Sequence, residues 1–160
     1  MLGGLRAEWV LEANGPLALA ATADILPLVL VTHNPTYRDE EVLQPDGSLR
    51  RVKTETGRAL VYGAGLSPFG LQAYLAQVRG ARVFGGGAVG ALWFTRDTPV
   101  PDSRRFNLTF EYGGGVELPI SETRTVVAGY KFHHFSNAYT APRNPGVDGN
   151  VLYLGVMRRR

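Results

Sequence analysis

The 160-residue sequence contains no cysteine, which excludes disulfide bonds, thiolate metal sites and a cysteine nucleophile. It also has no long apolar run. The richest window, residues 17–31, is interrupted by Asp24 and Pro27 and falls short of the roughly 20 apolar residues of a membrane helix. If the chain crosses a membrane, we therefore expect it to cross with strands.

A secretory signal is lacking too, because the opening Met1-Leu2-Gly3-Gly4 has no basic segment, apolar core or small-residue cleavage site. We interpret the chain either as cytoplasmic or as a mature or truncated form. Nucleic acid is not an expected partner, although the net charge is +3, because lysine and arginine are scattered and form no basic helix. We instead expect the lysine and arginine side chains to lie on a solvated surface or to contact anionic lipid.

The composition suits a folded protein, with 44% hydrophobic and 19% charged residues, and the length suits one domain over residues 1–160. Twenty glycines favour an all-β fold, because glycine weakens helices and is common at bulges and barrel bends. We interpret the run Gly85-Gly86-Gly87 as a site of strand bending or close packing, since it lacks the strand-to-helix setting and the lysine of a phosphate-binding loop.

Alternation of apolar and polar residues predicts strands, most clearly in residues 104–118, where one face is apolar and the other polar. Residues 5–12 alternate likewise, whereas the central segments alternate weakly but are rich in small and β-branched residues. The seven predicted strands are residues 5–12, 17–32, 59–75, 81–95, 104–118, 122–136 and 150–157.

Short and long connections alternate between these strands. The tight ones are residues 13–16, 76–80 and 119–121, and the long ones are residues 33–58, 96–103 and 137–149. Bacterial outer-membrane barrels combine short periplasmic turns with longer outer loops and usually have an even number of strands. We therefore expect an antiparallel outer-membrane β-barrel, an eight-stranded one lacking its N-terminal strand, with residues 137–149 outside and the C-terminus in the periplasm.

A soluble β-sandwich or lipocalin-like barrel is the alternative fold, and it would point its apolar residues inward. The charged segment 38–53 is interpreted as a solvated loop, with contact to sugar or phosphate as the less favoured reading.

A possible catalytic pair, His134 and Ser136, lies on the apolar face of the predicted strand 122–136. Residues two apart on a strand are separated by roughly 6.5–7 Å, so an imidazole can reach the hydroxyl that it must deprotonate. A carboxylate should orient that imidazole, and Asp148, just beyond the turn-forming Asn144-Pro145-Gly146, is the best-placed one. Taken alone, however, a His-x-Ser on a strand is usually incidental.

Asn137 and Asn144 are candidate donors to the oxyanion of a tetrahedral intermediate, together with backbone N–H groups of the loop. The sequence does not choose among these donors. His133 projects from the opposite face to its neighbour, so we expect an interior hydrogen-bonding residue and no histidine-pair metal site.

The order and spacing of these residues resemble the lipid A 3-O-deacylases, a family also described as PagL-type or acyloxyacyl hydrolase-like. The family pattern is His-x-Ser-Asn-Ala, a short loop, then Asn-x-Gly and an acid. The corresponding residues here are His134, Ser136, Asn137, Ala138, Asn144, Gly146 and Asp148. The resemblance extends upstream through residues 62–71 and 106–115, over about the last two-thirds of the chain.

This resemblance implies an eight-stranded outer-membrane barrel that hydrolyses the acyl ester at position 3 of lipid A in lipopolysaccharide and releases a 3-hydroxy fatty acid. Ser136 would be the nucleophile, His134 the base and Asp148 the orienting acid, on the outside of the barrel near the outer leaflet. Asn137 and Asn144 would support the oxyanion or the loop, and no metal or cofactor is required.

The expected partners are lipid A and outer-membrane lipid, while the oligomeric state is left open, with a homodimer as one option. Two other functions are compatible with the sequence. One is a non-catalytic structural or adhesion barrel, in which the motif only shapes an outer loop. The other is a soluble lipocalin-like lipid binder.

Overall fold

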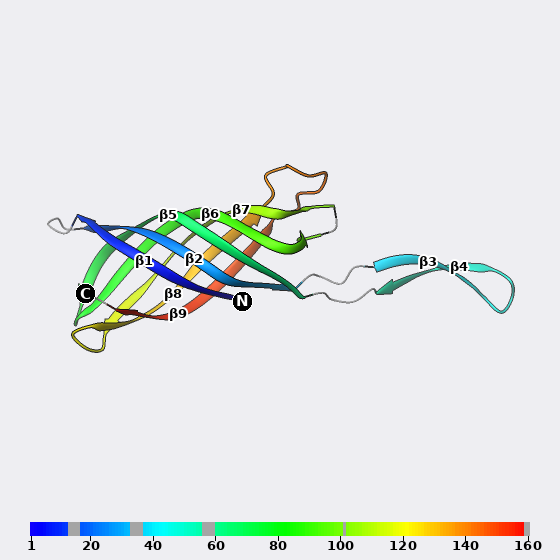
Figure 1. The fold of residues 1–160 in the computed structure, drawn as a ribbon. Coiled ribbons are helices and arrows are strands. Elements are labelled where there is room, and N and C mark those ends of the chain that lie inside the picture. Colours follow the sequence, from blue (N-terminus) through cyan, green and yellow to red (C-terminus); the bar gives the residue numbers. More distant parts are fainter. Residues whose placement is uncertain (13–16, 33–36, 56–59, 101, 159–160) are drawn as a thin grey trace.

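The protein is built from antiparallel strands. The computed structural model describes residues 1–12, 17–32, 37–55, 60–100 and 102–158, and within them it contains nine strands and no helix (Figure 1). Seven strands form one sheet in the order β1-β2-β5-β6-β7-β8-β9. They are β1 (Leu2–Glu12), β2 (Ala18–Thr32), β5 (Leu60–Val78), β6 (Ala81–Thr98), β7 (Arg104–Pro119), β8 (Arg124–Ser136) and β9 (Val147–Arg158). The seven strands predicted from the sequence are thereby confirmed, with ends shifted by a few residues.

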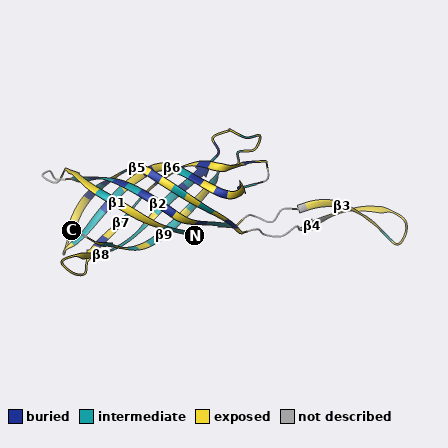
Figure 2. Cartoon of the chain, in the orientation of Figure 1, coloured by how far each residue is buried: buried dark blue, intermediate teal, exposed yellow. Residues whose placement is uncertain are grey.

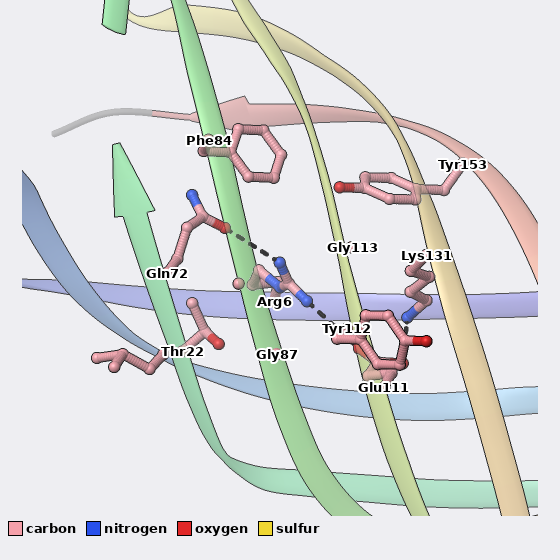
Figure 3. A pocket seen from close by; sticks show the side chains of 12 residues that line it. Arg6, Thr22, Gln72, Phe84, Gly87, Glu111, Tyr112, Gly113, Lys131 and Tyr153 are labelled. Atoms are coloured by element: carbon pink, nitrogen blue, oxygen red, sulfur yellow. Dashed lines mark hydrogen bonds and ion pairs between the residues drawn. The ribbon is translucent and has the colours of Figure 1, made fainter. Parts of the chain in front are cut away.

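The sheet curls around a polar interior. Strands β1 and β7 are separated by three other strands in the sheet, yet Arg6 Nη2 on β1 lies 3.7 Å from Glu111 Oε1 on β7. Near one end, the Tyr74 hydroxyl on β5 is hydrogen-bonded to carboxylate oxygens of Glu8 at 2.6 Å and Glu117 at 2.8 Å. Figure 3 shows Arg6 reaching toward both Gln72 and Glu111 across this interior. Within the described residues, the edge strands β1 and β9 are not paired with each other.

The two faces of the sheet differ in polarity, as β7 shows most clearly. Its outer face carries apolar and aromatic side chains that are 36% to 57% exposed: Phe106, Leu108, Phe110, Tyr112, Val116 and Leu118. Its inner face carries buried polar side chains: Asn107, Thr109, Glu111 and Glu117. The predicted alternation is confirmed here (Figure 2). The lipocalin-like alternative required the opposite orientation, with apolar side chains inside, and this strand contradicts it.

β-Bulges explain why the central strands alternate weakly in the sequence. In β2 the buried positions run from Ala20 to Leu26 in steps of two and then change parity at Val29, where the register with β5 shifts. A slip of one residue moves the following side chains to the other face of a sheet. The shift contributes to an apolar cluster inside one end of the sheet, which the sequence did not predict. This cluster comprises Leu26, Val29, Val61, Leu92, Phe94 and Phe135.

The glycine-rich segments of β6 and β7 lie against each other, with Gly86 opposite Gly113 and Gly85 opposite Gly114. A Cβ atom on Gly86 would come within 2.4 Å of the Leu71 carbonyl oxygen on β5, so the backbones approach too closely for a side chain. The reading of these glycines as sites of close strand packing is therefore confirmed.

The charged segment 38–53 is not an irregular loop. It forms a two-stranded hairpin of β3 (Tyr37–Leu43) and β4 (Leu49–Glu55), which projects away from the large sheet in Figure 1. At its turn, Asp46 Oδ1 accepts hydrogen bonds from the Ser48 N–H at 2.9 Å and the Ser48 hydroxyl at 2.6 Å. The segment is solvated as predicted, because its described side chains are almost all exposed, but the expected loop was wrong. Charged residues such as Glu41 and Arg51, which oppose each other across the strands, occupy positions where apolar residues would have revealed the alternation.

Long and short connections lie at opposite ends of the sheet, as predicted. The β6–β7 and β8–β9 connections and the hairpin lie at one end, which we call the loop end (Figure 1). The β5–β6 and β7–β8 turns and the C-terminal strand end lie at the other, the turn end. The predicted tight turn 13–16 falls outside the described residues. Within the described chain, no helix is long and apolar enough to span a membrane.

Candidate active site

Three neighbouring strands bring one residue each into a row across the outer face at the loop end. Phe110 on β7 is the cross-strand partner of His134 on β8, and His134 is the partner of Asp148 on β9. The sequence predicted that Asp148 returns toward His134, and the strand register places the two directly opposite each other. Side chains of directly opposed residues share one face of a sheet, so this contact is fixed by the register of β8 and β9.

His134 and Asp148 are joined by a short hydrogen bond of 2.6 Å between Nδ1 and Oδ1. With the carboxylate accepting from Nδ1–H, the other ring nitrogen, Nε2, is left free to act as a base. The Asp148 side chain is 67% exposed and that of His134 is 27% exposed, so this pair lies at the surface of the sheet. The arrangement is that of an oriented general base.

Ser136 is the next outward residue along β8 and lies at its last position, opposite Leu108. It is partly buried. Within the described residues, its hydroxyl makes no hydrogen bond to His134. Catalytic hydrogen bonds are often long in ligand-free enzymes and tighten only when substrate binds. The structure thus joins two of the three predicted triad members and places the third beside them.

The loop after Ser136 is braced by Asn137, whose side chain is buried. Its Nδ2 donates to the Ser103 hydroxyl at 3.1 Å and to the Arg143 carbonyl at 2.6 Å, and its backbone N–H donates to Asn144 Oδ1 at 2.9 Å. Both amide hydrogens of Asn137 are therefore engaged in holding the loop. Within the described residues, the amide hydrogens of Asn144 are not engaged.

The loop conformation was not visible in the sequence. Ala138 and Tyr139 both adopt positive φ angles, of 51° and 60°, directly after the Ser-Asn pair. Such angles are uncommon for residues other than glycine. The Arg104 guanidinium also donates two hydrogen bonds to the Thr140 carbonyl, at 2.9 and 3.0 Å, and so ties the loop to β7.

Gly146 lies against the edge of the His134 ring and has a φ of +63°. A Cβ atom built on it would be 3.1 Å from His134 Cε1 and 3.8 Å from Nε2. A larger residue would both strain the backbone and press on the imidazole. The sequence predicted Gly146 as part of a turn, and the structure places it beside the His134 ring, where a side chain would touch it.

Phe110 is a site residue that the sequence analysis missed. Its ring stacks on the His134 imidazole with centroids 4.9 Å apart and an interplanar angle of 29°. Only the register of β7 against β8 reveals this pairing, and no spacing along the sequence encodes it. His133, in contrast, lies in the interior as predicted, with Nε2 3.0 Å from the Thr109 hydroxyl and Nδ1 3.0 Å from a Glu111 oxygen.

An apolar groove adjoins the site on the outer face. It has a volume of about 560 Å³ and its outward-facing lining includes Trp9, Phe69, Leu71, Val89, Phe110 and Tyr112. Small residues form its floor. Ala21 lies between Trp9 and Leu71 in the strand register, and Gly87 lies between Leu71 and Tyr112. Phe110 belongs both to the groove and to the surroundings of His134.

Comparison with known proteins gives one match. The family model described as lipid A 3-O-deacylase (PagL) matches residues 29–157, a range that includes His134, Ser136, the loop and Asp148. Neither the search of curated proteins nor that of solved structures finds a match. Because the family match covers well over half of the 160 residues, the chain belongs to the lipid A 3-O-deacylase (PagL) family.

Proposed function

We propose that the protein is an outer-membrane serine esterase that hydrolyses the 3-O-linked acyl ester of lipid A. The observation that carries this proposal is the 2.6 Å hydrogen bond between His134 and Asp148, which lies on the outer, apolar face two residues from Ser136. A catalytic group on that face suits a substrate that is itself a membrane lipid. Membership of the family supports the choice of reaction.

In the proposed reaction the Ser136 hydroxyl attacks the carbonyl carbon of the acyl ester while its proton passes to His134 Nε2. The tetrahedral intermediate then collapses, the bond to the sugar oxygen breaks, and the proton moves from His134 to that oxygen. A water molecule, deprotonated by the same imidazole, releases the acyl group as a fatty acid and restores Ser136. Asp148 holds the ring and stabilises its charged form in both steps.

The negative oxygen of the intermediate needs hydrogen-bond donors beside Ser136. We propose that the Asn144 amide supplies one of them, because its hydrogens are not engaged within the described residues and its oxygen is anchored by the Asn137 N–H. Asn137 would act by bracing the loop, since its own amide hydrogens are bound to Ser103 and Arg143.

The dimensions of the apolar face support a membrane location. The twelve steps from Phe106 to Leu118 on β7 correspond to about 40 Å of strand, or about 28 Å across a bilayer when the strand is tilted by about 45°. Outer-membrane barrels carry an apolar band of about 25 Å. We therefore propose that the sheet spans the outer membrane with its loop end outside.

The depth of the site also suits an acyl ester. Trp93 and Phe106 are cross-strand partners on the outer face at the loop end, where aromatic residues commonly mark the membrane interface. Ser136 lies closer to the middle of the sheet than this aromatic pair, because it opposes Leu108, the next outward-facing residue of β7 after Phe106. At this height lipid A changes from sugar to acyl chain, and the apolar groove beside His134 would receive the chain.

The proposal is tested by incubating the purified protein, folded in detergent micelles, with lipid A and measuring released 3-hydroxy fatty acid. We expect release by the wild type and none by Ser136→Ala, whereas Ser121→Ala, in the β7–β8 turn at the other end, retains it. A fluorophosphonate probe should label Ser136 only when His134 is intact. An absence of both release and labelling would instead indicate a non-catalytic barrel.

A further inference from the structure

The His134 imidazole is bounded on three sides by residues from three different segments. Asp148 on β9 binds Nδ1, Gly146 in the loop lies against the Cε1 and Nε2 edge, and Phe110 on β7 covers a ring face. Each contact restricts a different motion of the ring. The hydrogen bond to Asp148 orients Nδ1, but the Asp148 side chain is 67% exposed, so both side chains can turn together about their Cα–Cβ and Cβ–Cγ bonds.

Such a joint rotation would swing Nε2 away from Ser136 without breaking the bond to Asp148. The stack on Phe110, with centroids 4.9 Å apart and planes inclined by 29°, is the contact that defines the ring plane. Gly146 cannot replace it, because a glycine presents no side-chain surface to the ring. Asp148 cannot replace it either, because its side chain is largely exposed and held by one hydrogen bond.

We propose that Phe110 is a positioning residue for the general base: its ring sets the plane of the His134 imidazole and so directs Nε2 toward Ser136. This inference rests on the proposed esterase function. A second contribution follows from the same geometry, because the face of an aromatic ring attracts a cation. Phe110 therefore also stabilises the imidazolium that exists while His134 holds the serine proton.

The competing explanation is that Phe110 only contacts the acyl chain, since it also lines the apolar groove. The two roles differ in their dependence on chain length. An acyl contact matters for long chains and appears in KM, whereas ring positioning acts on the proton transfer and appears in kcat for any ester.

The kinetic test compares Phe110→Leu, Phe110→Tyr and Phe106→Leu on p-nitrophenyl acetate and p-nitrophenyl dodecanoate. We expect Phe110→Leu to lower kcat about tenfold on both esters with KM within about twofold, and Phe110→Tyr to restore most of kcat. Phe106→Leu removes another outward aromatic ring of β7, one that contacts Trp93, and should leave kcat unchanged. A loss confined to KM of the dodecanoate, or an equal loss in Phe106→Leu, would overturn the proposal.

Ring orientation is measured separately by NMR, through the nuclear Overhauser effect between His134 Hε1 and the α-protons of Gly146. The effect should be strong in the wild type and in Phe110→Tyr and weaken in Phe110→Leu. If it persists unchanged in Phe110→Leu, Phe110 does not set the ring plane. Because this readout needs no turnover, an orientation change in a protein without esterase activity would refute the proposed function and leave the positioning role intact.

Discussion

The most informative substitution at the site is Asp148→Asn, because it keeps the shape of the side chain and removes its charge. In the wild type, Oδ1 accepts a hydrogen bond from His134 Nδ1 at 2.6 Å. An asparagine can instead present an N–H to Nδ1, which places the ring proton on Nε2. The imidazole is then protonated at the nitrogen that should accept the proton of Ser136.

The size of the effect follows from the attraction between the carboxylate and the imidazolium formed during the reaction. At about 4 Å this attraction is about 1 kcal/mol in water and about 4 kcal/mol at an effective dielectric constant near 20. Asp148 is 67% exposed in the isolated chain, but on the proposed lipid-facing surface it would meet less water. The corresponding loss in kcat lies between about fivefold and about 10³-fold, and we expect about 10²-fold.

The assay is the release of 3-hydroxy fatty acid from lipid A by wild type, Asp148→Asn, Asp148→Glu and Glu122→Gln in the same micelles. Asp148→Glu keeps the charge and should retain more activity than Asp148→Asn. Glu122→Gln removes an exposed carboxylate from the β7–β8 turn and should match the wild type. If Asp148→Asn turns over within about twofold of the wild type, Asp148 does not orient the base.

Three further substitutions test the loop beside His134, the apolar groove and the close packing of the strands. Gly146→Ala should lower kcat about tenfold, because its Cβ would press on the His134 imidazole. Gly80→Ala, at a similar φ of +86° but with nothing within 4 Å, should share the backbone strain and keep kcat. Tyr112→Leu, in the apolar groove, should raise the KM for long-chain esters and leave the KM for p-nitrophenyl acetate unchanged, as measured by steady-state kinetics. Gly129→Ala should destabilise the fold, because its Cβ would lie 2.5 Å from the Tyr153 hydroxyl and 2.6 Å from a backbone carbonyl oxygen; a thermal melt no different from the wild type would contradict this.

The large sheet could be predicted from the sequence most clearly at β7, where apolar and polar residues alternate with a period of two. In β7 every second side chain faces out over the whole strand, so polarity alone identifies the two faces. In β2 the same rule fails at the bulge between Leu26 and Val29, because the irregular backbone there changes the parity. Pro27 lies in this bulge and is its one mark in the sequence. The β3–β4 hairpin was missed for a different reason, since its strands bury no apolar face.

The candidate site was predictable where it depends on neighbours along the chain. His134 and Ser136 share a face because they are two residues apart, and Asp148 follows a recognisable turn. Phe110 was not predictable, because its contact with His134 depends on the register between two strands. The hydrogen bonds of the Asn137 amide were equally hidden, because Ser103 and Arg143 come beside it only in the folded loops.

Mass spectrometry of lipid A tests whether Ser136 is the nucleophile of an esterase that acts on this lipid. After incubation with the wild-type protein, lipid A should lose the mass of one 3-hydroxyacyl group from position 3, and after incubation with Ser136→Ala it should be unchanged. Loss of the same group with Ser136→Ala, or an unaltered spectrum with the folded wild type, would contradict the assignment.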